Sequence, residues 1–311
     1  MARHRLTGTL APHGQKRTQR HPRPGGNRAE KLAARRARIA DTSSGTSRPF
    51  AGLAAECDLI ALRNFVSSAT AKLPLAAADA REVRVATVLP GASQALARRE
   101  GDAVVGYAAL QTQAQGGDPA SCLAGAVEFA ASAAAGDSLA DVRRGDLTAL
   151  LTADATLDVT VHTSFDWWIA EGVQPDPQTA ELVQNANSFV QPAARLDAGV
   201  VGAPWWADTG SKAHVRWVHP ADEDELMRAL ARVHAAGGLT LGEGSRFAGS
   251  FRADGVLVPV FDVDRESHPN EWVPGTVALG ERLTEALADD SELTAEQRRS
   301  RDGIRGRQVS I

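Results

Sequence analysis

The sequence has little cysteine and no long hydrophobic run, and these two absences exclude several classes of protein. Cys57 and Cys122 are the only cysteines in 311 residues, too few for a four-cysteine zinc site or a disulfide framework. The longest mainly apolar stretch, residues 123–135, carries Glu128 and is shorter than the roughly 18 residues that a transmembrane helix needs. We therefore predict no membrane span, no metal site and no cofactor.

A secretory signal and the common catalytic motifs are also missing. The first 25 residues are rich in arginine and histidine and contain no apolar segment, so we predict a cytoplasmic protein. The patterns GxSxG, HExxH, CxxC and GxxxxGK[ST] do not occur, which argues against the enzyme classes that carry them. The sequence leaves open whether the protein is an enzyme and favours a non-catalytic role.

Charge is distributed unevenly along the chain. The net charge of −4 combines +10 over residues 1–40 with −14 over the remaining residues. A strongly basic segment is attracted to polyanions, because binding releases the counterions condensed on their phosphates. We predict that residues 1–47 form a disordered basic arm and linker and that residues 1–40 contact nucleic acid or the ribosome. A solubilising tail without a fixed partner is the alternative.

Hydrophobic patterns of both periods occur in the body of the chain. Period-two alternation and turn signals predict strands over residues 83–89, 103–110, 157–162, 193–201 and 213–218, and a hairpin over residues 250–262. Helical spacing and Asp or Pro start signals predict helices over residues 53–65, 118–135, 175–188, 220–237 and 271–288. This mixture predicts an α+β fold with mainly antiparallel sheets.

The order of these elements suggests two lobes. We predict an N-terminal α+β lobe over residues 48–154, a tryptophan-rich C-terminal lobe over residues 155–290 and a basic tail over residues 291–311. Neighbours in a strand point to opposite faces. One tryptophan of each of the pairs 167–168 and 205–206 is therefore expected in the core, and its neighbour on a surface or seam. An exposed partner would offer a stacking platform, whereas the alternative is that both pairs fill the interior.

Two polar, glycine-containing stretches, residues 208–216 and 242–252, carry the best candidate for a ligand site. Glycine turns with exposed N–H groups bind anions, and basic side chains nearby reinforce that. The candidate ligand-binding residues are Trp205, Trp206, Asp208, Lys212, His214, Arg216, Glu243, Ser245, Arg246 and Arg252. We predict that the two stretches line one pocket in the C-terminal lobe, in which carboxylates pair most of the bases and one base is left for an anionic ligand.

Two further groups of residues have both a functional and a structural interpretation. Asp262 and Asp264 are two apart at a strand end and either bind a divalent cation, share a proton or are simply solvated. His162 and His214 lie on predicted strands and have the residue type of a general base. We favour the structural interpretation for both groups.

Three long segments carry a family resemblance: RPFAGLAAECDLIALRNFVSSATAKL from Arg48, WWADTGSKAHVRWV from Trp205 and LGEGSRFAGSFRADGVLVPVFDVD from Leu241. On these segments the body resembles an actinobacterial family of uncharacterised proteins, some of which are labelled SecA-like preprotein translocases. The resemblance implies no activity and no site residues. The closely spaced cysteines of the SecA zinc-binding tail and the nucleotide loop of its motor do not occur in this sequence.

The sequence therefore favours one function and leaves a second open. The favoured function is a non-catalytic binding module whose basic arm contacts nucleic acid or the ribosome, with a protein partner also possible. The alternative is an enzyme or binder that acts on an anionic small molecule in the C-terminal lobe.

Overall fold

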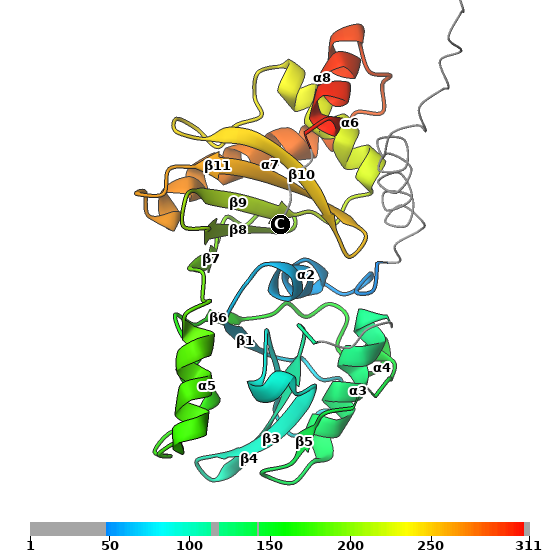
Figure 1. Ribbon diagram of the computed structural model, residues 1–311. Helices are drawn as coiled ribbons and strands as arrows, with labels where there is room; N and C mark the ends of the chain where they lie inside the picture. The colour runs from blue at the N-terminus through cyan, green and yellow to red at the C-terminus, as the bar shows by residue number, and fades with distance from the viewer. Residues whose placement is uncertain (1–47, 113–117, 142, 308–311) are drawn as a thin grey trace, which may run out of the picture. The chain divides into compact units, whose positions relative to one another are not determined.

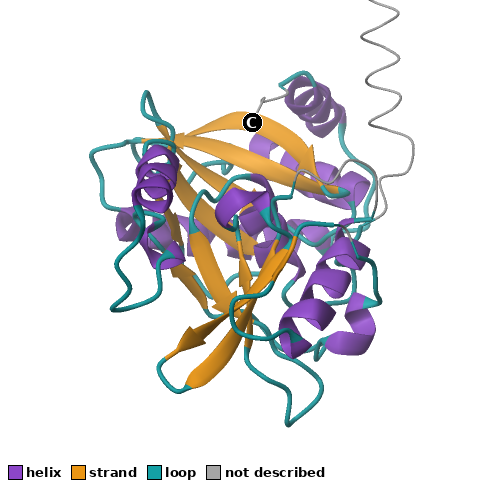
Figure 2. Ribbon diagram, turned by 60° about the horizontal axis from the view of Figure 1, so that its bottom comes forward, coloured by secondary structure: helices purple, strands orange, loops and turns teal. Residues whose placement is uncertain are grey.

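The computed structural model describes residues 48–112, 118–141 and 143–307, and the predicted basic arm lies outside them. Helices and two β-sheets confirm the α+β fold (Figures 1 and 2). Residues Ser47–Ile311 form one compact unit. Within the described ranges, no helix is long and apolar enough to cross a membrane.

The first sheet has the strand order β5-β3-β4-β2-β1-β6. Its strands are β1 (Ala69–Lys72), β2 (Val83–Ala86), β3 (Ala95–Glu100), β4 (Ala103–Ala109), β5 (Ser138–Leu139) and β6 (Val159–Val161). β2 and β4 pair in parallel, and the other neighbours pair antiparallel. The sequence pattern located β2, β4 and β6, but it missed β1 and β3, whose short runs carry charged residues.

The second sheet is antiparallel throughout and has the order β10-β11-β9-β8-β7. Its strands are β7 (Ala193–Arg195), β8 (Ala203–Asp208), β9 (Ala213–Val218), β10 (Arg246–Ala253) and β11 (Val256–Val263). The β10–β11 hairpin turns on Asp254 and Gly255, with φ of 44° and 81°. Such a two-residue loop needs positive φ at both positions, and the predicted hairpin forms with Ala253 paired to Val256.

Helices flank both sheets, and several of them begin at an aspartate whose side chain caps the first turn. The helices are α2 (Glu56–Asn64), α3 (Pro119–Ser132), α4 (Leu147–Leu150), α5 (Pro177–Asn187), α6 (Glu223–Ala235), α7 (Val273–Leu287) and α8 (Ala295–Arg305), with 3-10 turns η1 (Pro90–Ala92), η2 (Asp166–Trp168) and η3 (Pro269–Trp272). Asp118 accepts a hydrogen bond from Ser121 N at the start of α3, and Asp222 accepts from Asp224 N at the start of α6. These side chains satisfy N–H groups that a helix start leaves unpaired.

The boundary between the two sheets differs from the predicted boundary between the lobes at residue 155. β6, expected to open the second lobe, pairs antiparallel with β1 and is an edge strand of the first sheet. The second sheet begins only at β7, after α5. In the predicted basic tail, α8 packs on α6 and buries Ile304. The division into two lobes itself remains a prediction.

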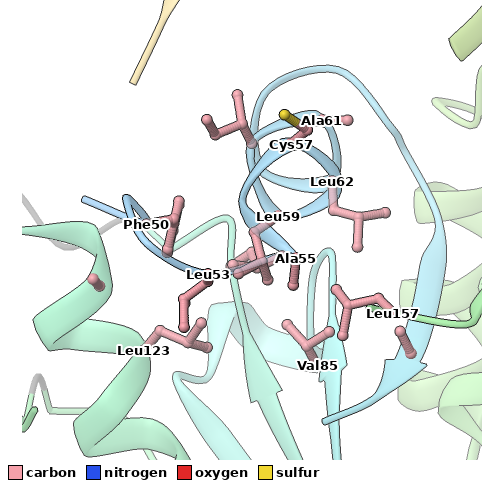
Figure 3. Packing of buried hydrophobic residues seen from close by; sticks show 14 of the residues in the cluster. Phe50, Leu53, Ala55, Cys57, Leu59, Ala61, Leu62, Val85, Leu123 and Leu157 are labelled. Atoms are coloured by element: carbon pink, nitrogen blue, oxygen red, sulfur yellow. The ribbon is translucent and has the colours of Figure 1, made fainter. Parts of the chain in front are cut away.

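The helix α2 is buried on all sides. Every residue from Glu56 to Leu62 is buried, and one hydrophobic cluster joins residues of both sheets around them. In Figure 3, Leu59 and Leu62 lie on the side of Val85 and Leu157, while on the other side Asp58 accepts a hydrogen bond from Trp205 Nε1 in β8. α2 packs between the two sheets although it carries two buried carboxylates, because Arg48 pairs with Glu56 and Arg195 pairs with Asp58.

Candidate functional site

Strand β9 carries the candidate site because two polar residues lie on one of its faces. Residues two apart in a strand share a face, so His214 and Arg216 project to the same side, as predicted. β9 lies between β8 and β11, and its register places His214 opposite Asp262 of β11. The two side chains nevertheless meet different surroundings.

Asp262 gathers three basic side chains into what we call the Asp262 cluster. Its Oδ2 atom accepts hydrogen bonds from Lys212 Nζ at 3.1 Å and from Arg246 at 2.8 Å. Its Oδ1 atom lies 3.1 Å from His214 Nδ1. Burial raises the pKa of Asp262, but the bonds from Arg246 and Lys212 outweigh it and leave that pKa below its ordinary value. The carboxylate is therefore ionised at neutral pH and compensates its basic neighbours.

His214 is neutral at neutral pH. Burial lowers its pKa, Asp262 opposes that effect, and the charges of Arg216 and Lys212 lower the pKa further. The net pKa lies below the ordinary value of 6.5. His214 therefore adds no positive charge to its surroundings.

Arg216 is buried without a counterion. Its exposed fraction is 8%, and it makes no ion pair or side-chain hydrogen bond within the described part of the chain; its guanidinium carbon lies 5.2 Å from the centroid of the Phe65 ring. Burial lowers the pKa of Arg216, but an arginine keeps its proton in proteins. Among the described residues, the charge of Arg216 is therefore stabilised by an aromatic ring and by no counterion.

The Arg216 side chain lines a cavity of about 500 Å³, which we call the Arg216 cavity. Its walls come from the end of α2, the segments that follow β4 and α5, and the β8–β9 hairpin. The lining residues are Asn64, Phe65, Val66, Ser67, Gln111, Phe189, Gln191, Thr209, His214 and Arg216. A volume of this size is within the range of small-molecule sites.

A family model described as a family of unknown function (DUF5926) matches residues 49–311. The chain belongs to that family. No curated protein and no solved structure matches it. Membership of DUF5926 assigns no activity, so the chemistry of the site has to come from its geometry.

In this DUF5926 chain the Arg216 cavity is lined by residues of the first polar stretch and not by residues of the second, and the single pocket predicted from both stretches stays a prediction. Lys212 and Arg246 meet on Asp262, but neither lines the Arg216 cavity. Arg252 pairs with Glu223 of α6, because the hairpin register places it at the end of β10 away from Arg246. Asp208 pairs with Arg265.

The glycine loop of the second stretch has a local structural role. Ser245 Oγ accepts from Leu241 N at 2.8 Å and donates to Gly242 O at 2.7 Å. Glu243 is exposed and lies outside the residues that line the cavity. These contacts close a turn, and the basic residue that follows it, Arg246, pairs with Asp262.

The tryptophan pair of β8 is buried on both faces and offers no stacking platform. Trp205 has no exposed surface and belongs to the core around α2. Trp206, 8% exposed, packs in the second core with Leu226 of α6 and Leu279 of α7. The two side chains point to opposite faces as predicted, and both are inside because helices cover the sheet on both sides.

The remaining candidates also have structural surroundings. Trp167 donates to Ser68 Oγ at 2.9 Å, and its ring stacks on His162 at a centroid distance of 5.4 Å. His162 Nε2 in turn lies 2.9 Å from Thr70 Oγ1. Asp264 accepts from the backbone N of Glu266 in the turn that follows β11. These contacts favour the structural interpretation of His162 and of the Asp262–Asp264 pair.

Sequence reasoning missed the half of the cavity that comes from the first part of the chain. Asn64, Gln111 and Phe189 carry no motif, and they come from three separate parts of the chain: the end of α2, the segment after β4 and the segment after α5. The sequence around Phe189 does not predict that this side chain is 73% exposed. No signal in one sequence brings these residues next to Arg216, because the contacts are long-range.

Proposed function

We propose that the protein binds a small anion in the Arg216 cavity, as a binding module rather than a catalyst. The observation that carries the proposal is the largely buried Arg216, whose guanidinium has no counterion or hydrogen-bond partner among the described residues and which lines the cavity. Removing a charge from water costs several kcal/mol unless an opposite charge or hydrogen bonds compensate it. An anion in the cavity would supply that compensation and would be attracted by the same charge.

The lining residues support binding more than catalysis. A hydroxyl nucleophile needs a base within hydrogen-bonding distance. Thr209 Oγ1 instead donates to Lys212 O at 2.9 Å, and Ser67 Oγ accepts from Gln191 N at 3.1 Å. Neither hydroxyl of the cavity wall is bonded to His214.

A panel of carboxylate and phosphate anions, screened by thermal unfolding and then by calorimetry, tests the proposal. An anion at about 100 times its Kd stabilises the protein by roughly 2.7 kcal/mol. We expect Arg216→Gln to weaken the best anion at least tenfold. Arg252→Gln is the matched control, because it removes a positive charge from the same sheet outside the cavity. Equal binding by Arg216→Gln and the wild type would refute the proposal.

The charge asymmetry of the sequence supports a second proposal, that residues 1–40 contact nucleic acid or the ribosome. These residues lie outside those that the structure describes, and the cytoplasmic location and actinobacterial origin are likewise predictions from sequence. Counterion release makes such binding strongly salt-dependent. Deleting residues 1–40 should weaken RNA or DNA binding and flatten its dependence on salt. An unchanged affinity and salt slope would remove this role.

A further inference from the structure

Two of the three amide side chains that line the Arg216 cavity, those of Asn64 and Gln111, have already used their donors; the third, Gln191, is exposed and makes no side-chain hydrogen bond among the described residues. Asn64 Nδ2 donates to Ile60 O and to Asp254 Oδ2, both at 2.8 Å. Gln111 Nε2 donates to Leu62 O at 2.7 Å and to Val66 O at 2.9 Å. An amide has two N–H donors and one carbonyl acceptor, so Asn64 Oδ1 and Gln111 Oε1 are what these side chains have left to offer a ligand.

The hydroxyl of Thr209 also has only acceptor lone pairs left for a ligand. Its proton goes to Lys212 O at 2.9 Å, so its remaining lone pairs accept. Ser67 is the opposite case, because its oxygen accepts from Gln191 N and its proton is left to donate. Together, Asn64, Gln111 and Thr209 present acceptors to a ligand that enters the cavity.

The charge of the cavity is that of one cation. Arg216 is positive and His214 is neutral, and the described residues that line the cavity include no carboxylate. Lys212 and Arg246 are bound to Asp262 and do not line it. A second negative charge on the ligand would lie in a partly buried site with no cation to pair it, and next to carbonyl oxygens.

From these two features we infer that the occupant of the Arg216 cavity is a hydroxylated monocarboxylate, a conclusion that rests on the proposed anion binding. One carboxylate accepts the fork of N–H donors of the Arg216 guanidinium, whose geometry matches it. Hydroxyl groups on the body of the ligand donate to the acceptors of Asn64, Gln111 and Thr209. The absence of a carboxylate among the lining residues disfavours a ligand that also carries an ammonium group, such as an amino acid.

Calorimetric titration with four probes tests each part of the inference. D-gluconate has one carboxylate and several hydroxyls, hexanoate has the carboxylate alone, D-glucitol has hydroxyls alone, and D-glucose 6-phosphate has hydroxyls with a doubly charged head group. We expect gluconate to bind at least tenfold more tightly than each of the other three. Arg216→Gln should weaken gluconate at least tenfold, while Arg252→Gln should bind it as the wild type does.

Thr209→Val tests the acceptor role without touching the cation. It should reduce the affinity for gluconate about threefold to tenfold, the effect of one hydrogen bond, and leave that for hexanoate unchanged. Thr284→Val is the matched control, because Thr284 also donates to a backbone carbonyl, Gly280 O at 2.8 Å, but lies on α7 away from the cavity lining. A loss for both ligands in Thr209→Val would indicate a structural effect and contradict the acceptor role.

The outcomes separate this inference from the anion proposal. Tighter binding of glucose 6-phosphate than of gluconate, abolished by Arg216→Gln, would overturn the monocarboxylate and keep the anion site. Equal binding of hexanoate and gluconate would overturn the hydroxylated body alone. If none of the probes and no anion of the wider panel binds, or if Arg216→Gln binds them as well as the wild type, both proposals fail.

Discussion

Two arginines of the second half of the chain are buried to the same degree but differ in their partners. Arg216 of β9 is 8% exposed and Arg232 of α6 is 7% exposed. Arg232 donates to Ala286 O at 3.4 Å and to Ser291 O, and its Nε lies 3.1 Å from Asp289 Oδ2. These contacts fasten α6 to the end of α7, so Arg232 is explained by the fold, whereas Arg216 is not.

A third buried basic side chain, His219, is accommodated in a different way. Burial lowers its pKa to about 4, and its Nδ1 atom accepts a hydrogen bond from Ala221 N at 3.2 Å. The imidazole is therefore neutral at neutral pH. A histidine can shed its charge when it is buried, but an arginine cannot. Arg216 has neither of the two ways in which the fold accommodates a buried base: it has no partner like those of Arg232, and it cannot lose its charge as His219 does.

Among these three side chains, the largest expected effect on stability is the pH dependence due to His219. Its folded pKa of about 4 lies below the ordinary 6.5, so the unfolded chain binds the proton first. This contribution to stability is complete above pH 6.5 and falls as the pH drops towards 4, by about 2 kcal/mol at pH 5 and roughly 3 kcal/mol in all. Urea unfolding at pH 7 and pH 5 should show a smaller difference for His219→Gln than for the wild type, and equal differences would contradict a neutral His219.

The next effect is the loss of the contacts of Arg232. Arg232→Met should lower the free energy of unfolding by about 2 kcal/mol, because it leaves the carbonyl oxygens of Ala286 and Ser291 without their donor. Asp289 is half-exposed and adds little. Urea unfolding measures the change, and a free energy within a few tenths of the wild-type value would show that Arg232 is no more structural than Arg216.

The smallest effect is expected at Arg216 itself. Arg216→Met removes a buried charge that has no counterion and loses a contact with the Phe65 ring worth about 0.5–1 kcal/mol. Replacing buried charges by apolar side chains of similar volume is often neutral or stabilising, so the free energy of unfolding should stay unchanged or rise by about 1 kcal/mol. A loss as large as that of Arg232→Met would contradict the difference between the two arginines, because it would mean that Arg216 already has a stabilising partner.

The sequence predicted local features well and long-range ones poorly. Alternation placed His214 and Arg216 on one face of β9 because strand geometry alone determines it. It could not place Arg252, since the β10–β11 register and α6 decide which residues that side chain meets. The same limit applies to Gln111, which comes from the segment after β4 and reaches Arg216 across more than a hundred residues of chain.

Burial of both faces of a sheet is likewise beyond a local pattern. Period two predicts that Trp205 and Trp206 point in opposite directions, and they do. It does not reveal that α2 covers one face while α6 and α7 cover the other. The same arrangement removes the counterion from Arg216, since the face that meets α2 offers its guanidinium the Phe65 ring instead of a carboxylate.

The position of α2 between the two sheets also has a consequence for the timing of synthesis. Its partners in β8 and β9 follow it by more than a hundred residues, and a ribosome adds about 5–20 residues per second. The side of α2 that packs on the second sheet therefore stays exposed for on the order of ten seconds or more, until that sheet has been synthesised. During that interval the nascent chain exposes the hydrophobic surface of α2. We therefore expect a chaperone to bind this segment during synthesis.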